Sequence, residues 1–93
     1  LTPVSGSPFS TGSAPTGVAI TPTSDFVYVT NNNDHNISAY SVNQGTGVLT
    51  PVAGSPFPAG TFAHAAAINA AGDFLFVANA GSDNISVYYI NQG

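Results

Sequence analysis

Two loops of the chain collect oxygen-bearing side chains that could bind a cation. Residues 31–36 read NNNDHN and residues 79–84 read NAGSDN. Asp34 and Asp83 are the carboxylates of these loops, and Ca²⁺ takes about six to eight oxygen ligands. Each loop holds one carboxylate, at positions that do not correspond, and the EF-hand spacing is absent. Asn, Asp and Gly also form ordinary turns. We therefore keep Asp34 and Asp83 as calcium candidates beside the simpler prediction of polar turns, and we expect no other metal and no cofactor.

The two histidines are the next candidates for chemistry. His64 stands at the entry of a predicted strand and has no carboxylate near it in sequence, which makes it a poor general base. We expect a packed or hydrogen-bonded histidine there, with a ligand contact as the alternative. His35, inside NNNDHN, is predicted to be a solvated loop residue.

Two further patterns occur twice at equivalent places. Asp25 and Asp73 each stand just before a predicted strand, and we expect their side chains to cap backbone N–H groups. A carboxylate pair for glycoside hydrolysis is the alternative. Asn36-Ile37-Ser38 and Asn84-Ile85-Ser86 are glycosylation sequons, although each also begins a strand. No G-x-S-x-G elbow occurs, and no catalytic residue is predicted.

The composition excludes several classes of protein. The 93 residues include no Lys or Arg, and charged residues make up 4%, against about 25% in ordinary domains. A chain without Lys or Arg lacks the cationic side chains that bind the phosphate groups of nucleic acids and of phosphorylated substrates. No apolar run reaches the roughly 20 residues of a membrane span. An amide- and hydroxyl-rich surface does little to repel its own copies. The composition favours an extracellular or cell-surface material over a cytoplasmic enzyme.

The elements that must position these residues repeat along the chain. Residues 1–45 align without a gap with residues 49–93, at an offset of 48, and 22 of the 45 pairs are identical. This period is typical of propellers and solenoids. We predict two repeats, 1–48 and 49–93, with the outer strand first in each.

Each repeat reads as four short strands separated by turn signals. The predicted strands are 1–4, 17–21, 26–30 and 37–42, and then 49–52, 65–69, 74–78 and 85–90. The fold class is therefore all-β, with two four-stranded antiparallel repeats that resemble propeller blades.

Several strands are apolar on both faces, so these sheets expect cover on both sides. Two blades cover one face of each other and leave two faces bare. We expect the apolar strand residues to form the core or the interface between blades, namely Phe26, Tyr28, Val29, Ile37, Phe74, Phe76, Val77, Ile85 and Tyr88.

A named resemblance rests on the second strand and its surroundings. Residues 28–31 spell YVTN and residues 76–79 spell FVAN, followed in each repeat by N-I-S-x-Y. The segment T-G-x-L-T-P-V-x-G-S-P-F follows. This resembles the YVTN repeats of the lactonase-like β-propellers, and it implies blade architecture over essentially the whole chain. Enzymes of that family are said to use Arg, Glu and His. This chain has no Arg or Glu, so no catalytic position is carried over and we expect no enzyme.

The phase of the repeat predicts how copies meet. Strand 49–52 should pair with strand 37–42, which leaves strand 1–4 without a partner and strand 85–90 with a vacant edge. Residues Leu1–Val4 of one copy should then pair with Ile85–Ile90 of another, by β-strand addition. The predicted partner is the chain itself, in a homo-oligomeric ring or filament. The predicted interface residues are Leu1, Thr2, Pro3, Val4, Ile85, Val87 and Tyr89.

Other interpretations stay open. The chain could be an excerpt of a longer tandem array, a fragment of a lactonase-like enzyme or ligand-binding propeller, or a designed propeller piece.

Overall fold

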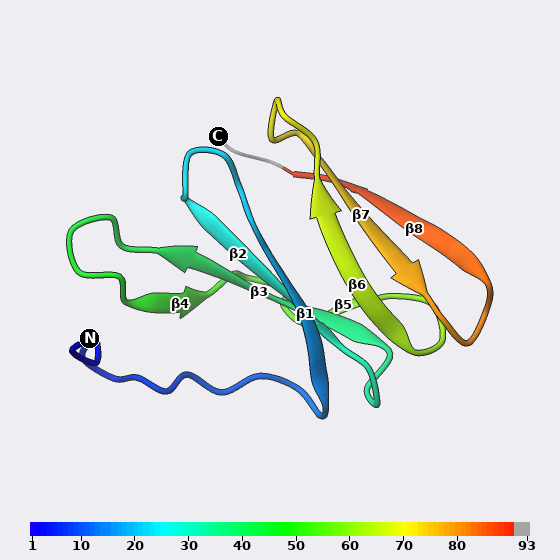
Figure 1. Cartoon of the computed structure of the whole chain (residues 1–93), viewed down its shortest axis with the longest axis horizontal. Coiled ribbons are helices and arrows are strands. Elements are labelled where there is room, and N and C mark those ends of the chain that lie inside the picture. The colour runs from blue at the N-terminus through cyan, green and yellow to red at the C-terminus, as the bar shows by residue number, and fades with distance from the viewer. Residues whose placement is uncertain (91–93) are drawn as a thin grey trace.

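The computed structural model describes residues 1–90 and contains two antiparallel sheets that lie side by side (Figure 1). Asn91, Gln92 and Gly93, which end the predicted second repeat, lie outside the described residues. The first blade consists of β1 (Pro15–Ile20), β2 (Phe26–Asn31), β3 (Asn36–Val42), β4 (Leu49–Pro51) and β5 (Phe57–Pro58). The second blade consists of β6 (Ala63–Ile68), β7 (Phe74–Asn79) and β8 (Asn84–Tyr89).

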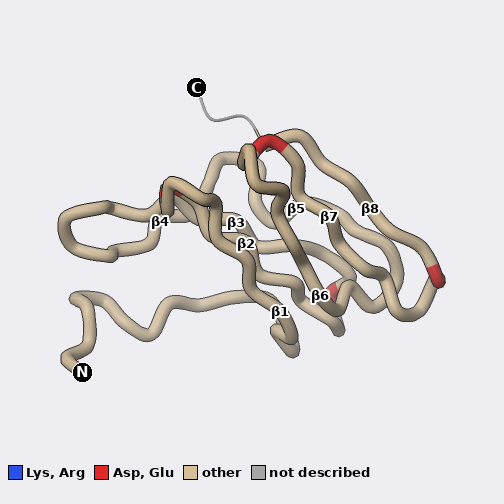
Figure 2. The backbone as a smooth tube through the Cα atoms, turned by 45° about the horizontal axis from the view of Figure 1, so that its top comes forward, with Lys and Arg blue, Asp and Glu red and all other residues tan. Residues whose placement is uncertain are grey.

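The prediction of an all-β fold with antiparallel, blade-like sheets is confirmed. Residues 1–90 form strands and turns and contain no helix, and hence no helix long and apolar enough to cross a membrane. Figure 2 shows the acidic residues of this part of the chain in the turns between strands, with no Lys or Arg anywhere on the trace.

The two blades repeat each other in register. Pro15 pairs with Asn31 in the first blade as Ala63 pairs with Asn79 in the second, and a bulge follows both Pro15 and Ala63. The offset of 48 therefore holds for the backbone as well as for the sequence. Because the pairing continues through the bulge, β1 and β6 each begin two residues before the predicted strands.

The free edge of β3 is completed by two short strands from the segment that leads to the second blade. Tyr40 pairs with Pro51 and Val42 pairs with Leu49, which confirms the predicted pairing of strand 49–52 with strand 37–42. At the other end of β3, Ile37 pairs with Phe57 of β5. β5 was not among the strands predicted from the sequence.

Residues 1–14 form no strand, so the strand predicted at residues 1–4 is not found in the single chain. The physical reason is that a strand needs a ladder partner, and β3 already pairs with β4 and β5. Val4 instead lies against the turn before β4, because a Cβ placed on Gly47 would stand 3.2 Å from a Val4 methyl carbon. The second blade has three strands among the described residues, and the edge of β8 that was predicted to be vacant carries no strand there.

The core lies between the blades, where β6 packs against β1 and β2. The buried cluster consists of Ile37, Ala63, Leu75, Val77 and Ile90. Ile37 and Val77 are core residues, as predicted. Phe76 and Ile85 lie outside this core, because 39% and 67% of their surfaces are exposed, and for them the predicted role at an interface between blades stays a prediction.

Candidate blade-stacking surface

Hydroxyl and amide groups join the inner strands of the two blades. The Thr16 and Thr30 hydroxyls both donate to the carbonyl of His64, at 2.7 and 3.0 Å. The Asn32 amide donates to the carbonyl of Ala63 at 3.3 Å. Neutral donors therefore fix the distance and register of one blade on the next, without any ion pair between side chains.

The approach at this contact is close. A Cβ placed on Gly17 would lie 2.9 Å from the His64 carbonyl oxygen and 3.2 Å from the Ala65 Cα, and both are backbone atoms that cannot turn aside. Gly17 therefore lets the two inner strands meet. His64 takes part through its backbone while its side chain is exposed, so the hydrogen bonding predicted for this histidine involves the carbonyl.

His35 joins the blades at the end of the sheet. Its Nδ1 accepts the Phe62 N–H at 2.8 Å, and its ring meets the Phe62 ring edge-on at a centroid distance of 4.9 Å. His35 is exposed and lies in a turn, as predicted for a solvated loop residue, and in addition it contacts the loop that leads to β6. Nothing in a lone His of a polar loop indicates such a partner 27 residues away.

Two buried asparagines organise the turn at the same end of each blade. The Asn31 side chain accepts the Gly12 N–H at 3.0 Å and donates to Asn36 and Ser38 at 2.9 and 2.8 Å. Asn79 makes the equivalent three bonds, to Gly60, Asn84 and Ser86, at 3.0, 3.0 and 2.8 Å. The last residue of YVTN and the Asn and Ser of N-I-S thus form one network, which gives both sequons a structural role.

The acidic candidates act on turns. The Asp34 carboxylate accepts the Ser13 N–H at 2.8 Å, and Ser82 at the equivalent position accepts the Thr61 N–H at 3.2 Å. No group of three or more His, Cys, Asp or Glu side chains that could hold a metal occurs among residues 1–90. The calcium hypothesis for Asp34 and Asp83 stays a prediction.

The capping role predicted for Asp25 and Asp73 falls to their neighbours. The Thr21 hydroxyl accepts the N–H groups of Asp25 and Phe26, at 3.0 and 3.1 Å. The Asn69 side chain does the same for Asp73 and Phe74. The two aspartates accept side-chain donors instead, so the turn was predicted correctly and its cap was assigned to the wrong residue.

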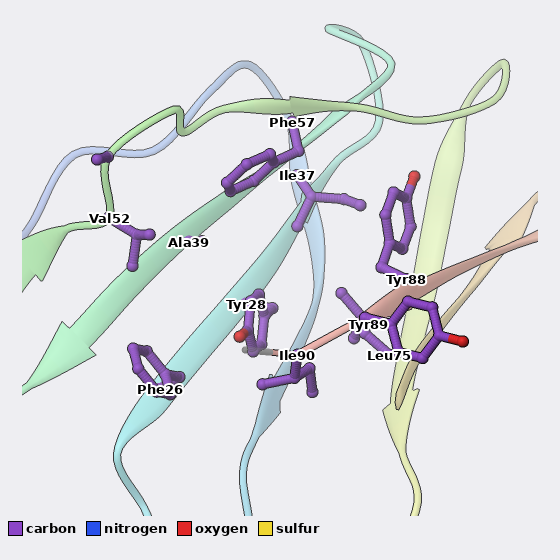
Figure 3. Close-up of a pocket in the computed structure, with 11 residues that line it drawn as sticks. Phe26, Tyr28, Ile37, Ala39, Val52, Phe57, Leu75, Tyr88, Tyr89 and Ile90 are labelled. Atoms are coloured by element: carbon purple, nitrogen blue, oxygen red, sulfur yellow. The ribbon is translucent and has the colours of Figure 1, made fainter. Parts of the chain in front are cut away.

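An apolar groove of about 290 Å³ opens between the outer parts of the blades (Figure 3). Tyr28 and Phe57 face it from the first blade, and Tyr88 and Ile90 face it from the second. Burial raises the pKa of the Tyr28 hydroxyl above its ordinary value of 10.0. The described residues that line it are apolar apart from tyrosine hydroxyl groups and include no carboxylate or histidine, so the groove can pack an apolar side chain.

The outer faces of the pair are bare copies of the faces that meet inside it. Ile37 is 1% exposed in the first blade, whereas Ile85, its equivalent in the second, is 67% exposed. Ala39 and Val87 form a second such pair, at 0% and 55%. On the opposite side, Val18 of the first blade is 67% exposed. These exposed fractions belong to one chain, and within residues 1–90 no segment covers these side chains.

The residues predicted for the assembly interface lie in two separate parts of the structure. Leu1, Thr2 and Pro3 are exposed, and Val4 is half-buried against Gly47. Ile85, Val87 and Tyr89 stand on one face of β8, and the Tyr89 ring lies 5.2 Å from the Phe74 ring. The structure brings the β8 residues together and leaves residues 1–4 apart from them.

Stacked, twisted antiparallel sheets with this repeat define a pair of blades, and therefore part of a β-propeller. The family model described as lactonase, 7-bladed beta-propeller matches residues 4–63. The chain belongs to this family of lactonase-like propellers. A comparison with curated protein sequences found no match.

The fold is also similar to a solved structure, the hydrazine synthase of Kuenenia stuttgartiensis. The TM-score is 0.66 at 25% sequence identity, and the match covers 96% of this chain. The chain spans 24% of the length of that protein chain. This likeness supports the assignment of the two sheets as blades within a larger propeller architecture.

Proposed function

We propose that the chain is a structural module that joins copies of itself head to tail, outside the cell or at its surface. The observation that carries this proposal is the pair Ile37 and Ile85. The same residue in the same register is buried where a blade follows it and is 67% exposed where none does. At roughly 25 cal/mol per Å² of apolar area, covering such a face stabilises an assembly.

The vacant edge of β8 supplies the second contact of the proposal. In the first blade, β4 pairs with the end of β3 through Tyr40↔Pro51 and Val42↔Leu49. The equivalent residues are Tyr88 and Ile90 on β8, and Pro3 and Leu1 of a second copy. Residues 1–4 would leave the turn at Gly47 and add a strand to β8, through main-chain hydrogen bonds.

The number of blades bears on the shape of the assembly. Head-to-tail contacts give a ring when the rotation closes and a filament when it does not. Copies of a two-blade unit give six or eight blades, whereas the family model has seven. A ring of copies would therefore differ from the family in blade number, and an open filament is the other geometry.

The second candidate is that the chain forms two blades of a longer lactonase-like enzyme or ligand-binding propeller. Membership of the family and the 24% share of the structural relative favour it. In that case the bare faces and the β8 edge would be covered by other blades of the same polypeptide. The absence of Arg and Glu from the sequence supports a non-enzymatic role for these two blades.

The state of assembly of the purified 93-residue chain tests the proposal. Mass photometry measures the mass of the particles over a range of concentrations, and electron microscopy shows whether they are rings or fibres. We expect rings or fibres that persist at high salt, because no Lys or Arg is available for an ion pair across the joint. Deletion of residues 1–5 should stop assembly and leave the β-sheet circular dichroism unchanged, whereas Thr2→Ser should assemble normally. A folded chain that stays monomeric at every concentration would overturn the proposal.

A further inference from the structure

The turn between β7 and β8 carries Asp83 at the place where the turn between β2 and β3 carries His35. Both residues have a left-handed backbone, with φ of 55° and 57°. In the first blade this position contacts the chain that leads to the next blade. The His35 Nδ1 accepts the Phe62 N–H at 2.8 Å, and the His35 carbonyl accepts the Ala59 N–H at 3.0 Å.

The matching donors exist at the start of the chain and are unused. Ala14 is the equivalent of Phe62, and their φ angles are 53° and 54°. Thr11 is the equivalent of Ala59. Within residues 1–90, neither the Ala14 N–H nor the Thr11 N–H has a hydrogen-bond partner, and the same holds for the Asp83 carboxylate. Two acceptors of Asp83, its carboxylate and its backbone carbonyl, and two backbone donors therefore lie at opposite ends of the pair of blades, with the backbone conformations that bond inside it.

We infer that Asp83 is a docking residue that receives a second copy of this chain. Its carboxylate accepts the Ala14 N–H of that copy, and its backbone carbonyl accepts the Thr11 N–H. This inference rests on the proposed head-to-tail association and names a contact that it had not included. A hydrogen bond to a carboxylate is roughly twice as strong as one between neutral groups. The change from His to Asp at this position therefore keeps the acceptor and strengthens it.

The same comparison identifies a residue that opposes the contact. Gly17 allows the inner strands of the two blades to meet, since a Cβ there would lie 2.9 Å from the His64 carbonyl oxygen. The second blade has Ala65 at this position, on its bare side. A second copy seated in the same way would place its Thr16 carbonyl against the Ala65 methyl group. The contact between copies is therefore looser at the inner strand than the contact within the chain.

Three substitutions in the full chain test this assignment, with the concentration dependence of assembly as the readout and a second copy as the probe. Asp83→Ala should raise the concentration needed for assembly about tenfold or more, as the loss of a hydrogen bond to a charged group implies. Asp83→His rebuilds the contact of the first blade and should assemble at a concentration close to that of the parent chain. Ala65→Gly should lower the required concentration, although Gly inside a strand does not stabilise the single chain.

Asp73→Asn is the matched control for charge, because it removes one negative charge from the opposite end of the second blade. If Asp83→Ala and Asp73→Asn change assembly equally, the effect is charge repulsion and the inference is overturned. If assembly depends on residues 1–5 but ignores both Asp83 and Ala65, the inference fails and the proposed function stands. If the parent chain and the Ala65→Gly variant both stay monomeric, the proposed function fails as well.

Discussion

Ile37 and Ile85 occupy the same position in two copies of one strand, and only the first is buried. Both follow an Asn that bonds the side chain of the last residue of the preceding strand. The strand sequence and its register thus fix which way the isoleucine points. A neighbouring blade decides whether it meets protein or water. Whether such a residue is buried therefore depends on the presence of a neighbouring blade, and the sequence of a single repeat does not determine it.

On the opposite faces of the blades, the residues of the first blade are exposed and those of the second blade are covered. Val18 and Ile20 of β1 are 67% and 53% exposed, whereas Ala66 and Ile68 at the equivalent positions of β6 pack against the core. Each blade therefore has one covered face, the one that meets the other blade. The face of the first blade that carries Val18 and the face of the second blade that carries Ile85 are exposed. The only interface in the described chain is the one between them, and its hydrophobic contacts hold both sheets.

Truncation of the two isoleucines should give the largest contrast. Ile37→Ala removes a side chain from the core and should lower the free energy of unfolding by about 2–5 kcal/mol. Ile85→Ala should change it by no more than about 0.5 kcal/mol in the monomer, because that side chain is exposed. Chemical denaturation at concentrations where the chain is monomeric measures both values. If Ile37→Ala does not fold, Ile37→Val should still cost about 0.5–1.5 kcal/mol. Equal losses at the two positions would refute the comparison.

The asparagine networks should behave alike in both blades, unlike the isoleucines. Asn31→Ala and Asn79→Ala each leave the partners of a buried amide unpaired and should cost about 1–3 kcal/mol. Thermal unfolding followed by circular dichroism checks this. Asp34→Ser is the mild control, because Ser82 already accepts the same kind of backbone N–H in the second blade. A large loss at Asn31 with none at Asn79 would mean that the two turns are not equivalent.

The smallest expected effect concerns Tyr28, which lies in the groove. Burial raises the pKa of its hydroxyl above 10.0, so the unfolded chain ionises at a lower pH than the folded one. The folded state is then the one that holds the proton, and stability falls as pH rises past 10.0. Below about pH 9 no contribution is expected, because the hydroxyl is neutral in both states. The free energy of unfolding of the parent chain, measured against pH, should therefore fall relative to that of Tyr28→Phe at alkaline pH. Parallel curves would contradict this assignment.

The strands are predicted well from the sequence because the alignment of the two repeats gives two independent indications for each strand position. The Ala run of β6 would suggest a helix by itself, but its alignment with Gly17, Val18 and Ala19 indicates a strand. The pairing of β4 with β3 followed from the phase of the repeat. The hydrogen-bond partners of the polar loop residues could not be predicted from the sequence. His35 meets Phe62, which differs from its equivalent Ala14, so the alignment of repeats has no signal for this contact.

The strand at residues 1–4 shows the other limit. Its sequence, LTPV, is identical to residues 49–52, yet only the second copy is paired with a strand. Identical sequences take different structures here because one has an edge of β3 beside it and the other does not. A prediction from local sequence assigns both the same state.

The placement of β4 and β5 on β3 has a consequence for how such chains change length. Residues 49–58 finish the first sheet with β4 and β5, and residues 63–89 then form the second sheet, so blade and repeat are out of phase. A gene duplication of one period, wherever its breakpoints fall, adds a blade and preserves every backbone junction. Only the side chains at the junction then need to diverge, as His35 and Asp83 or Gly17 and Ala65 have done. The number of repeats can then change in this architecture while the backbone pairing between neighbouring repeats is kept.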